Sequence, residues 1–174
     1  MKGVTAILAG LALLAGPAEA QRRCVTDAEA ESLALVALPE ILRETGRVCA
    51  ARLPSASLIR RADSPLIVRY QAAADRAWPD AKAAIVQLSD PAVEMLLQSD
   101  YARPVITSVV VPQIVGRIDL GDCATVDRLV TQLEPLSPRN TASIVVTVLR
   151  YLKADRARAG KAAVPQLPLC PVQP

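Results

Sequence analysis

The side chains of this chain that could perform acid–base chemistry are mainly carboxylates, because its 174 residues include no histidine. The Ser-His-Asp and Cys-His arrangements and the haem motif C-x-x-C-H are therefore excluded. Glu44 with Glu94, or Asp119 with Asp122 and Asp127, are the candidate acids for cleaving a glycosidic bond. With one tryptophan, three tyrosines and no phenylalanine, the chain has few rings on which sugars could stack. We expect a helix cap at Asp122 and solvated carboxylates elsewhere, and we assign no catalytic residue.

The aspartates also lack the spacing of a metal site. Asp119, Asp122 and Asp127 do not follow the D-x-[DN]-x-[DN]-G pattern of a calcium loop and have no closing glutamate. A zinc site usually contains a C-x-x-C pair or histidines, and neither is present. We expect no metal and no cofactor.

Four cysteines, Cys24, Cys49, Cys123 and Cys170, are the residues most suited to covalent chemistry. An even number of cysteines in an exported chain is typical of disulfides, and four cysteines allow three connectivities. We favour Cys24–Cys49 and Cys123–Cys170. The first pair requires the chain to fold back near Pro39, since a straight helix from residue 24 to residue 49 would separate the sulfurs by about 37 Å.

Residues 1–20 have the organisation of a secretory signal peptide. A positive start at Lys2 precedes an apolar run over residues 4–15, and Ala18-Glu19-Ala20 is a small-residue cleavage motif. The apolar run is shorter than the roughly 20 residues of a membrane span, so we expect cleavage and no transmembrane segment afterwards. The abundance of arginine, alanine and proline is typical of a GC-rich bacterial gene. We therefore predict a periplasmic or secreted protein whose mature net charge remains +3.

Several helix starts can be recognised. Thr26-Asp27-Ala28-Glu29 has the form of a capping box, which predicts a helix toward Cys49 with a break or kink at Pro39. Three junctions place a side-chain oxygen at the N-cap and a proline at the first helical position: Ser64-Pro65, Asp90-Pro91 and Ser137-Pro138. They predict helices over residues 65–77, 91–98 and 138–157, with Trp78-Pro79 interrupting the first before residues 81–88 continue it.

The most apolar part of the mature chain is the segment 104–118. Its isoleucines and valines recur at intervals of four residues, so a helix here would be apolar nearly all round and would be buried by its neighbours. A buried strand is the alternative, because valine and isoleucine favour strands and Pro112 would interrupt a helix. We favour a helix, either kinked or divided in two at Pro112, and expect it to be the buried centre of the fold.

The overall prediction is an all-α, single-domain helical bundle of about five to seven helices with Pro-kinked segments and two disulfides. The domain spans residues 21–163 and is followed by an extended Pro-rich tail over residues 164–174. We expect helix 123–133 to pack antiparallel to helix 138–157, which would allow the tail to return Cys170 to Cys123. An apolar stripe on the last helix contains five residues: Ile144, Val145, Val148, Leu149 and Leu152.

Tyr101 and Arg103 are the candidate contacts for a ligand or partner. An aromatic ring and a guanidinium at the start of an apolar helix could orient the head group of an amphiphile, although packing at a helix junction is the alternative. We expect an exported, non-enzymatic helical protein that binds a protein or an anionic envelope component. A carrier of a small apolar ligand such as a lipid and a histidine-free envelope hydrolase are the alternatives. Nucleic acid is not expected, given the compartment and the few aromatic residues.

Overall fold

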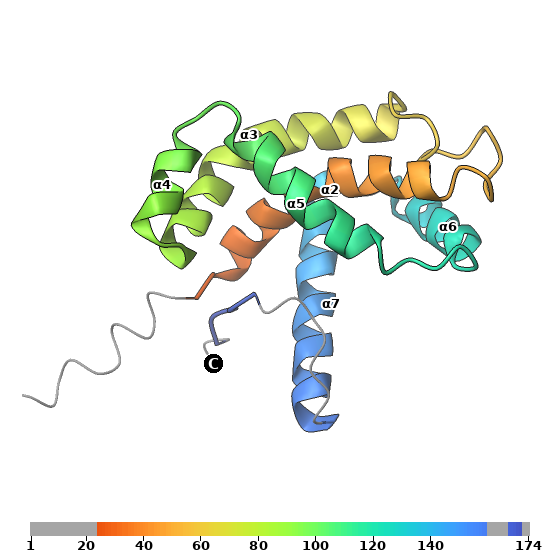
Figure 1. Cartoon of the computed structure of the whole chain (residues 1–174). Helices are drawn as coiled ribbons and strands as arrows, with labels where there is room; N and C mark the ends of the chain where they lie inside the picture. Colours follow the sequence, from red (N-terminus) through yellow and green to blue (C-terminus); the bar gives the residue numbers. More distant parts are fainter. Residues whose placement is uncertain (1–23, 160–166, 172–174) are drawn as a thin grey trace, which may run out of the picture.

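The computed structural model describes residues 24–159 and 167–171, within which the chain forms six helices and no strand (Figure 1). The helices are α2 (Asp27–Val48), α3 (Pro65–Leu88), α4 (Pro91–Leu97), α5 (Ala102–Val115), α6 (Cys123–Leu133) and α7 (Pro138–Ala159). The predicted all-α bundle is confirmed, whereas the predicted signal peptide lies outside the described residues. No helix in the described ranges is long and apolar enough to cross a membrane.

The predicted caps form at some of the helix starts. At the start of α2, the Glu29 N–H donates to Thr26 Oγ1 at 3.3 Å and the Thr26 N–H donates to Glu29 Oε2 at 2.7 Å, which completes the capping box. The Ser64 hydroxyl accepts from the Ile67 N–H at the start of α3. Asp90 and Asp122 precede α4 and α6 but make no side-chain cap bond. The prolines therefore mark all three predicted starts, and the side-chain caps accompany only some of them.

The prolines inside α2 and α3 do not interrupt these helices. The predicted interruption at Trp78-Pro79 is therefore wrong, and of the break or kink predicted at Pro39 the break does not occur. A proline within a helix removes one backbone hydrogen bond. In α2 the cost is offset by the complete burial of Pro39. In α3 the turns on both sides of Pro79 are anchored by buried alanines, including Ala77 and Ala81.

The centre of the molecule is the pair α2 and α3. Ala73, Ala77 and Ala81 of α3 form a cluster with Leu35 and Val36 of α2, and small side chains on one helix allow the two backbones to approach closely. Helix α7 joins this cluster, and α5 crosses α2 (Figure 1). The middle of the core is thus built from alanine-rich helices, not from the most apolar segment of the sequence.

Helix α5 is at the periphery, so the expectation that residues 104–118 form the buried centre is wrong. Within α5 only Ala102, Val111 and Val115 are buried, whereas the Val109 side chain is 57% exposed. The helix prediction itself is correct, and one helix continues through Pro112. Because α5 is apolar on nearly every side, its composition could not indicate which side would be covered.

The disulfides are Cys24–Cys170 and Cys49–Cys123, so both favoured pairs are wrong. Since α2 continues through Pro39, Cys24 and Cys49 lie at its opposite ends. Helix α6 packs with Cys123 into the core cluster at the Cys49 end of α2 instead of lying antiparallel along α7. Each bridge therefore ties one end of α2 to a distant part of the chain.

Residues 167–171, the described part of the C-terminal tail, join the N-terminal segment. The Val25 N–H donates to Pro168 O, and the Cys170 N–H donates to Val25 O, both at 2.8 Å. Arg150 of α7 donates to Cys170 O at 3.0 Å. With Cys24–Cys170, these bonds form a clasp between the two ends of the described chain.

Helix α7 buries a different face from the one that its sequence suggested. Ala142 and Val146 are buried against α2, α3 and the tail, whereas Ile144 and Val148 of the predicted stripe are exposed. The Tyr70 hydroxyl donates to Thr141 Oγ1 at 2.7 Å, and this buried bond helps to fix the rotation of α7.

Candidate functional site

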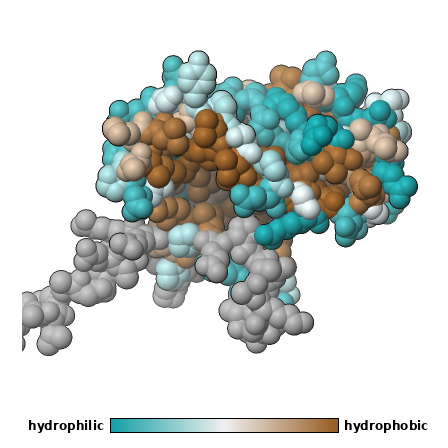
Figure 2. All heavy atoms as spheres, viewed as in Figure 1, coloured by the Kyte–Doolittle hydropathy of each residue, from teal (hydrophilic) through white to brown (hydrophobic). Residues whose placement is uncertain are grey.

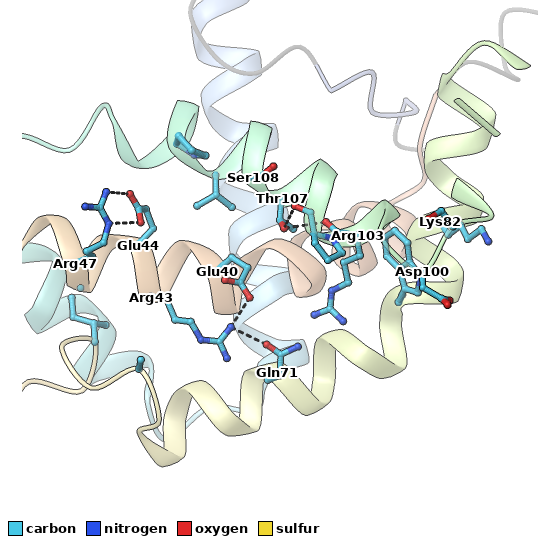
Figure 3. Close-up of a pocket in the computed structure, with 18 of the residues that line it drawn as sticks. Glu40, Arg43, Glu44, Arg47, Gln71, Lys82, Asp100, Arg103, Thr107 and Ser108 are labelled. Carbon is cyan, nitrogen blue, oxygen red and sulfur yellow. Dashed lines mark hydrogen bonds and ion pairs between the residues drawn. The ribbon is translucent and has the colours of Figure 1, made fainter. Parts of the chain in front are cut away.

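A groove of about 1310 Å³ lies between α2, α3 and α5, and the turn between α4 and α5 closes one end of it (Figure 3). Three helices contribute most of the polar side chains of its walls: Glu40, Arg43, Glu44 and Arg47 from α2; Gln71 and Lys82 from α3; Arg103, Thr107 and Ser108 from α5. The turn between α4 and α5 adds Gln98, Ser99 and Asp100, and the loop before α3 adds Arg60.

Apolar residues form the base of the groove. Ile59, Leu97 and Val111 are buried and border the cavity. The loop that carries Ile59 approaches α2 closely at Gly46, where an added Cβ would lie 1.8 Å from Ile59 O. Gly46 is therefore required for the loop to reach this position, and the loop in turn supplies part of the base.

Ion pairs fix the α2 wall. Arg43 bonds Glu40 at 2.5 Å and also donates to Gln71 Oε1 of α3 at 2.9 Å, so it joins two walls of the groove. Arg47 donates to Glu44 through two nitrogens, and this bonding lowers the pKa of the Glu44 carboxyl. A general acid requires a raised pKa, so Glu44 is suited to accepting hydrogen bonds.

Arg103 ties the start of α5 to α3. Its Nη1 donates to Asp75 Oδ1 at 2.5 Å, and Figure 3 shows the guanidinium pointing from α5 toward α3. Hydrogen bonding by Arg103, supported by a bond from Gln71, lowers the pKa of the Asp75 carboxyl. The Nη2 atom of Arg103 is buried and has no acceptor in the described structure. One guanidinium thus both positions α5 and contributes to the groove wall.

The two side chains that were predicted to contact a ligand or partner lie in different places. Arg103 lines the groove, whereas Tyr101 is 75% exposed and does not line it. Trp78 and Lys82, one helical turn apart on α3, also line the groove and were not predicted. Neither has a hydrogen-bond partner among the described residues. Trp78 is the single tryptophan of the sequence and could have been chosen as a candidate for that reason, whereas nothing in the sequence distinguished Lys82.

The candidate acids are not brought together in this groove. Glu44 lines it, whereas Glu94 is exposed on α4. Asp127 accepts a 2.5 Å hydrogen bond from the buried Ser57 hydroxyl, while Asp119 and Asp122 are exposed. Within residues 24–159 and 167–171, no three cysteine, aspartate or glutamate side chains are grouped to hold a metal ion.

Comparisons with known proteins do not assign the groove a function. No protein-family model matches the chain, and no curated sequence or solved structure is significantly similar to it. The function must therefore be argued from the geometry.

Proposed function

We propose that this chain is an exported, non-enzymatic protein that binds a partner protein by taking an extended segment of it into the groove between α2, α3 and α5. The observation that carries the proposal is the groove itself, at about 1310 Å³. Sites for small molecules usually enclose about 300–1,000 Å³ and surround most of the ligand. This larger space, formed between helices and open to solvent, suits a length of polypeptide that enters and leaves it.

The lining matches the chemistry of a peptide. The buried side chains of Ile59, Leu97 and Val111 offer an apolar base for the partner's side chains. Above them, the unpartnered donors of Trp78 and Lys82 can bond backbone carbonyls or carboxylates. A wholly apolar ligand fits less well, because burying it would also cover the charged side chains of the α2 wall.

The two disulfides support an oxidising compartment as the place of action, because such bonds persist outside the cytoplasm. The export signal expected from residues 1–20 agrees with this compartment. The partner is therefore sought among exported or envelope proteins.

Site-specific photo-crosslinking in the native host tests the proposal. A benzoylphenylalanine residue replaces Ser108, which lines the groove, or Ala72, which is exposed on α3 and does not line it. We expect Ser108 to give a discrete protein adduct that mass spectrometry identifies, and Ala72 to give none. Equal adducts from both positions, or only lipid adducts from Ser108, would contradict the proposal.

A further inference from the structure

The outward side of α5 and the neighbouring α4 present apolar side chains that the groove does not use. Six of them are exposed by between 41% and 75%, and we refer to them as the outer surface: Met95, Leu96, Tyr101, Val105, Val109 and Val110. Figure 2 shows apolar atoms gathered over α4 and beside α5. Surfaces of this kind on soluble proteins mark interaction sites, and tyrosine and methionine are enriched in such interfaces.

The charges at the α4 end of the outer surface are acidic. Asp90 and Glu94 are exposed, and neither has a basic partner within the described part of the chain. Between Lys82 and Arg117 the sequence contains one basic residue, Arg103, whose guanidinium is bonded to Asp75 on the groove side. The outer surface is therefore apolar with an acidic border at its α4 end, while the exposed Arg117 follows the other end of α5.

We infer that the outer surface binds an amphipathic helix of a partner protein that carries basic side chains beside its apolar stripe. The acidic border supplies the charge complementarity, since unlike charges attract and like charges exclude wrong partners. Val105 and Val109 are one helical turn apart and form a ridge, the shape that packs into the groove of another helix. An anionic membrane surface is disfavoured, because the Asp90 and Glu94 carboxylates would face lipid head groups of the same sign.

This inference goes beyond the proposed function, because it concerns the opposite side of α5 and rests on a different observation. Either surface could bind without the other. The tests below therefore leave the groove unchanged, and a failure at the outer surface has no bearing on Ser108 crosslinking.

Titration with designed helical peptides tests the inference. The probes are an 18-residue leucine/lysine amphipathic peptide, the same pattern with glutamate in place of lysine, and a serine/lysine peptide without an apolar stripe. We expect the leucine/lysine peptide to bind the mature protein at least about tenfold more tightly than either control, with affinity that falls as salt is added. Amide chemical shifts should change mainly over residues 90–110.

Substitutions locate the contact. Glu94→Lys and Met95→Ser alter exposed side chains and should each weaken binding by about threefold to tenfold, because each removes one charged or apolar contact. Val148→Ser is the matched control, since Val148 is a similarly exposed apolar residue on α7. Equal binding of the lysine and glutamate peptides, or equal loss with Val148→Ser, would overturn the inference. So would a concentration-dependent dimer that Met95→Ser abolishes, because a second copy would then occupy the surface.

Discussion

The two sides of α5 differ in what surrounds them, and the side with the polar residues is the one that faces the groove. The inner side carries Arg103, Thr107, Ser108 and Val111 and forms one wall of the groove. The outer side carries Val105, Val109 and Val110, whose side chains are exposed. The difference shows that the burial of an apolar helix is decided by where its ends are attached, not by its composition alone.

Two attachments set the position of α5. At its start, Arg103 bonds Asp75 of α3. After its end, the chain reaches Cys123, which is buried and bonded to Cys49 at the end of α2. Between these points α5 forms one wall of the groove. The rotation of α5 about its own axis decides which of its side chains face the groove. The predictions below alter these attachments or one side of α5, in order of decreasing effect.

Loss of the Cys49–Cys123 bridge should have the largest effect. Replacing both cysteines with alanine should lower the free energy of unfolding by about 4 kcal/mol, since it removes a cross-link and buried sulfur atoms together. Urea denaturation measures the loss. Replacing Cys24 and Cys170 is the matched control: it should release the clasp while Trp78 fluorescence keeps its native emission in the folded protein. A loss of stability as large in the clasp variant as in the core variant would contradict the larger contribution expected from the buried Cys49–Cys123 bridge.

Gly46→Ala should have the next largest effect. The new Cβ would lie 1.8 Å from Ile59 O, so the loop at the base of the groove would have to move. We expect a loss of about 3 kcal/mol in the free energy of unfolding. Gly121→Ala is the control, because a Cβ there meets no atom within 4 Å. Similar stabilities for the two variants would mean that the loop does not approach α2 as described.

A pair of valine substitutions compares the two sides of α5 directly. Val111 is 4% exposed and Val109 is 57% exposed, yet the two differ by only two positions in one helix. Val111→Ala should cost about 2 kcal/mol because it leaves a cavity, whereas Val109→Ala should change stability by less than about 0.5 kcal/mol. Thermal and urea denaturation give both values. A larger loss at Val109 would place the outer side of α5 in the core.

Acid should weaken the attachment at the start of α5 by a smaller amount. The pKa of Asp75 is lowered in the folded protein by the Arg103 hydrogen bond, so its stabilising contribution is present above the unfolded pKa. The contribution is lost as the pH falls through the folded pKa. Asp75→Asn should therefore be less stable than the natural protein by about 0.5 kcal/mol at pH 7 and equally stable in strong acid. A difference that is unchanged across this range would exclude the ion pair as its cause.

Local features of this fold could be predicted because they depend on a few adjacent residues. The capping box at Thr26 and the prolines at positions 65, 91 and 138 mark helix starts that the structure confirms. The effect of Pro39 could not be predicted, because its cost is offset by burial among residues distant in the sequence. The wrong Cys24–Cys49 pair followed from that error, since an unbroken α2 separates these residues. The wrong Cys123–Cys170 pair followed from the expected antiparallel packing of α6 on α7, which the structure does not show.

The candidate site was less predictable than the fold. Arg103 was selected as the residue preceding an apolar helix, and it lines the groove, but Tyr101 two positions away points elsewhere. Trp78 and Lys82 come from another helix, and their approach to Arg103 depends on how α3 and α5 pack. A helix that is apolar on all sides has no periodicity from which its rotation could be read.

The central claim is that the inner side of α5 faces Trp78 of α3 across one open groove, and quenching of the single tryptophan tests it most directly. A nitroxide attached at Thr107→Cys, on the inner side, is compared with one attached at Val109→Cys, on the outer side. Intact-mass analysis verifies that the native disulfides are retained. We predict strong quenching of Trp78 fluorescence from position 107 and little from position 109, and equal or reversed quenching would contradict the account.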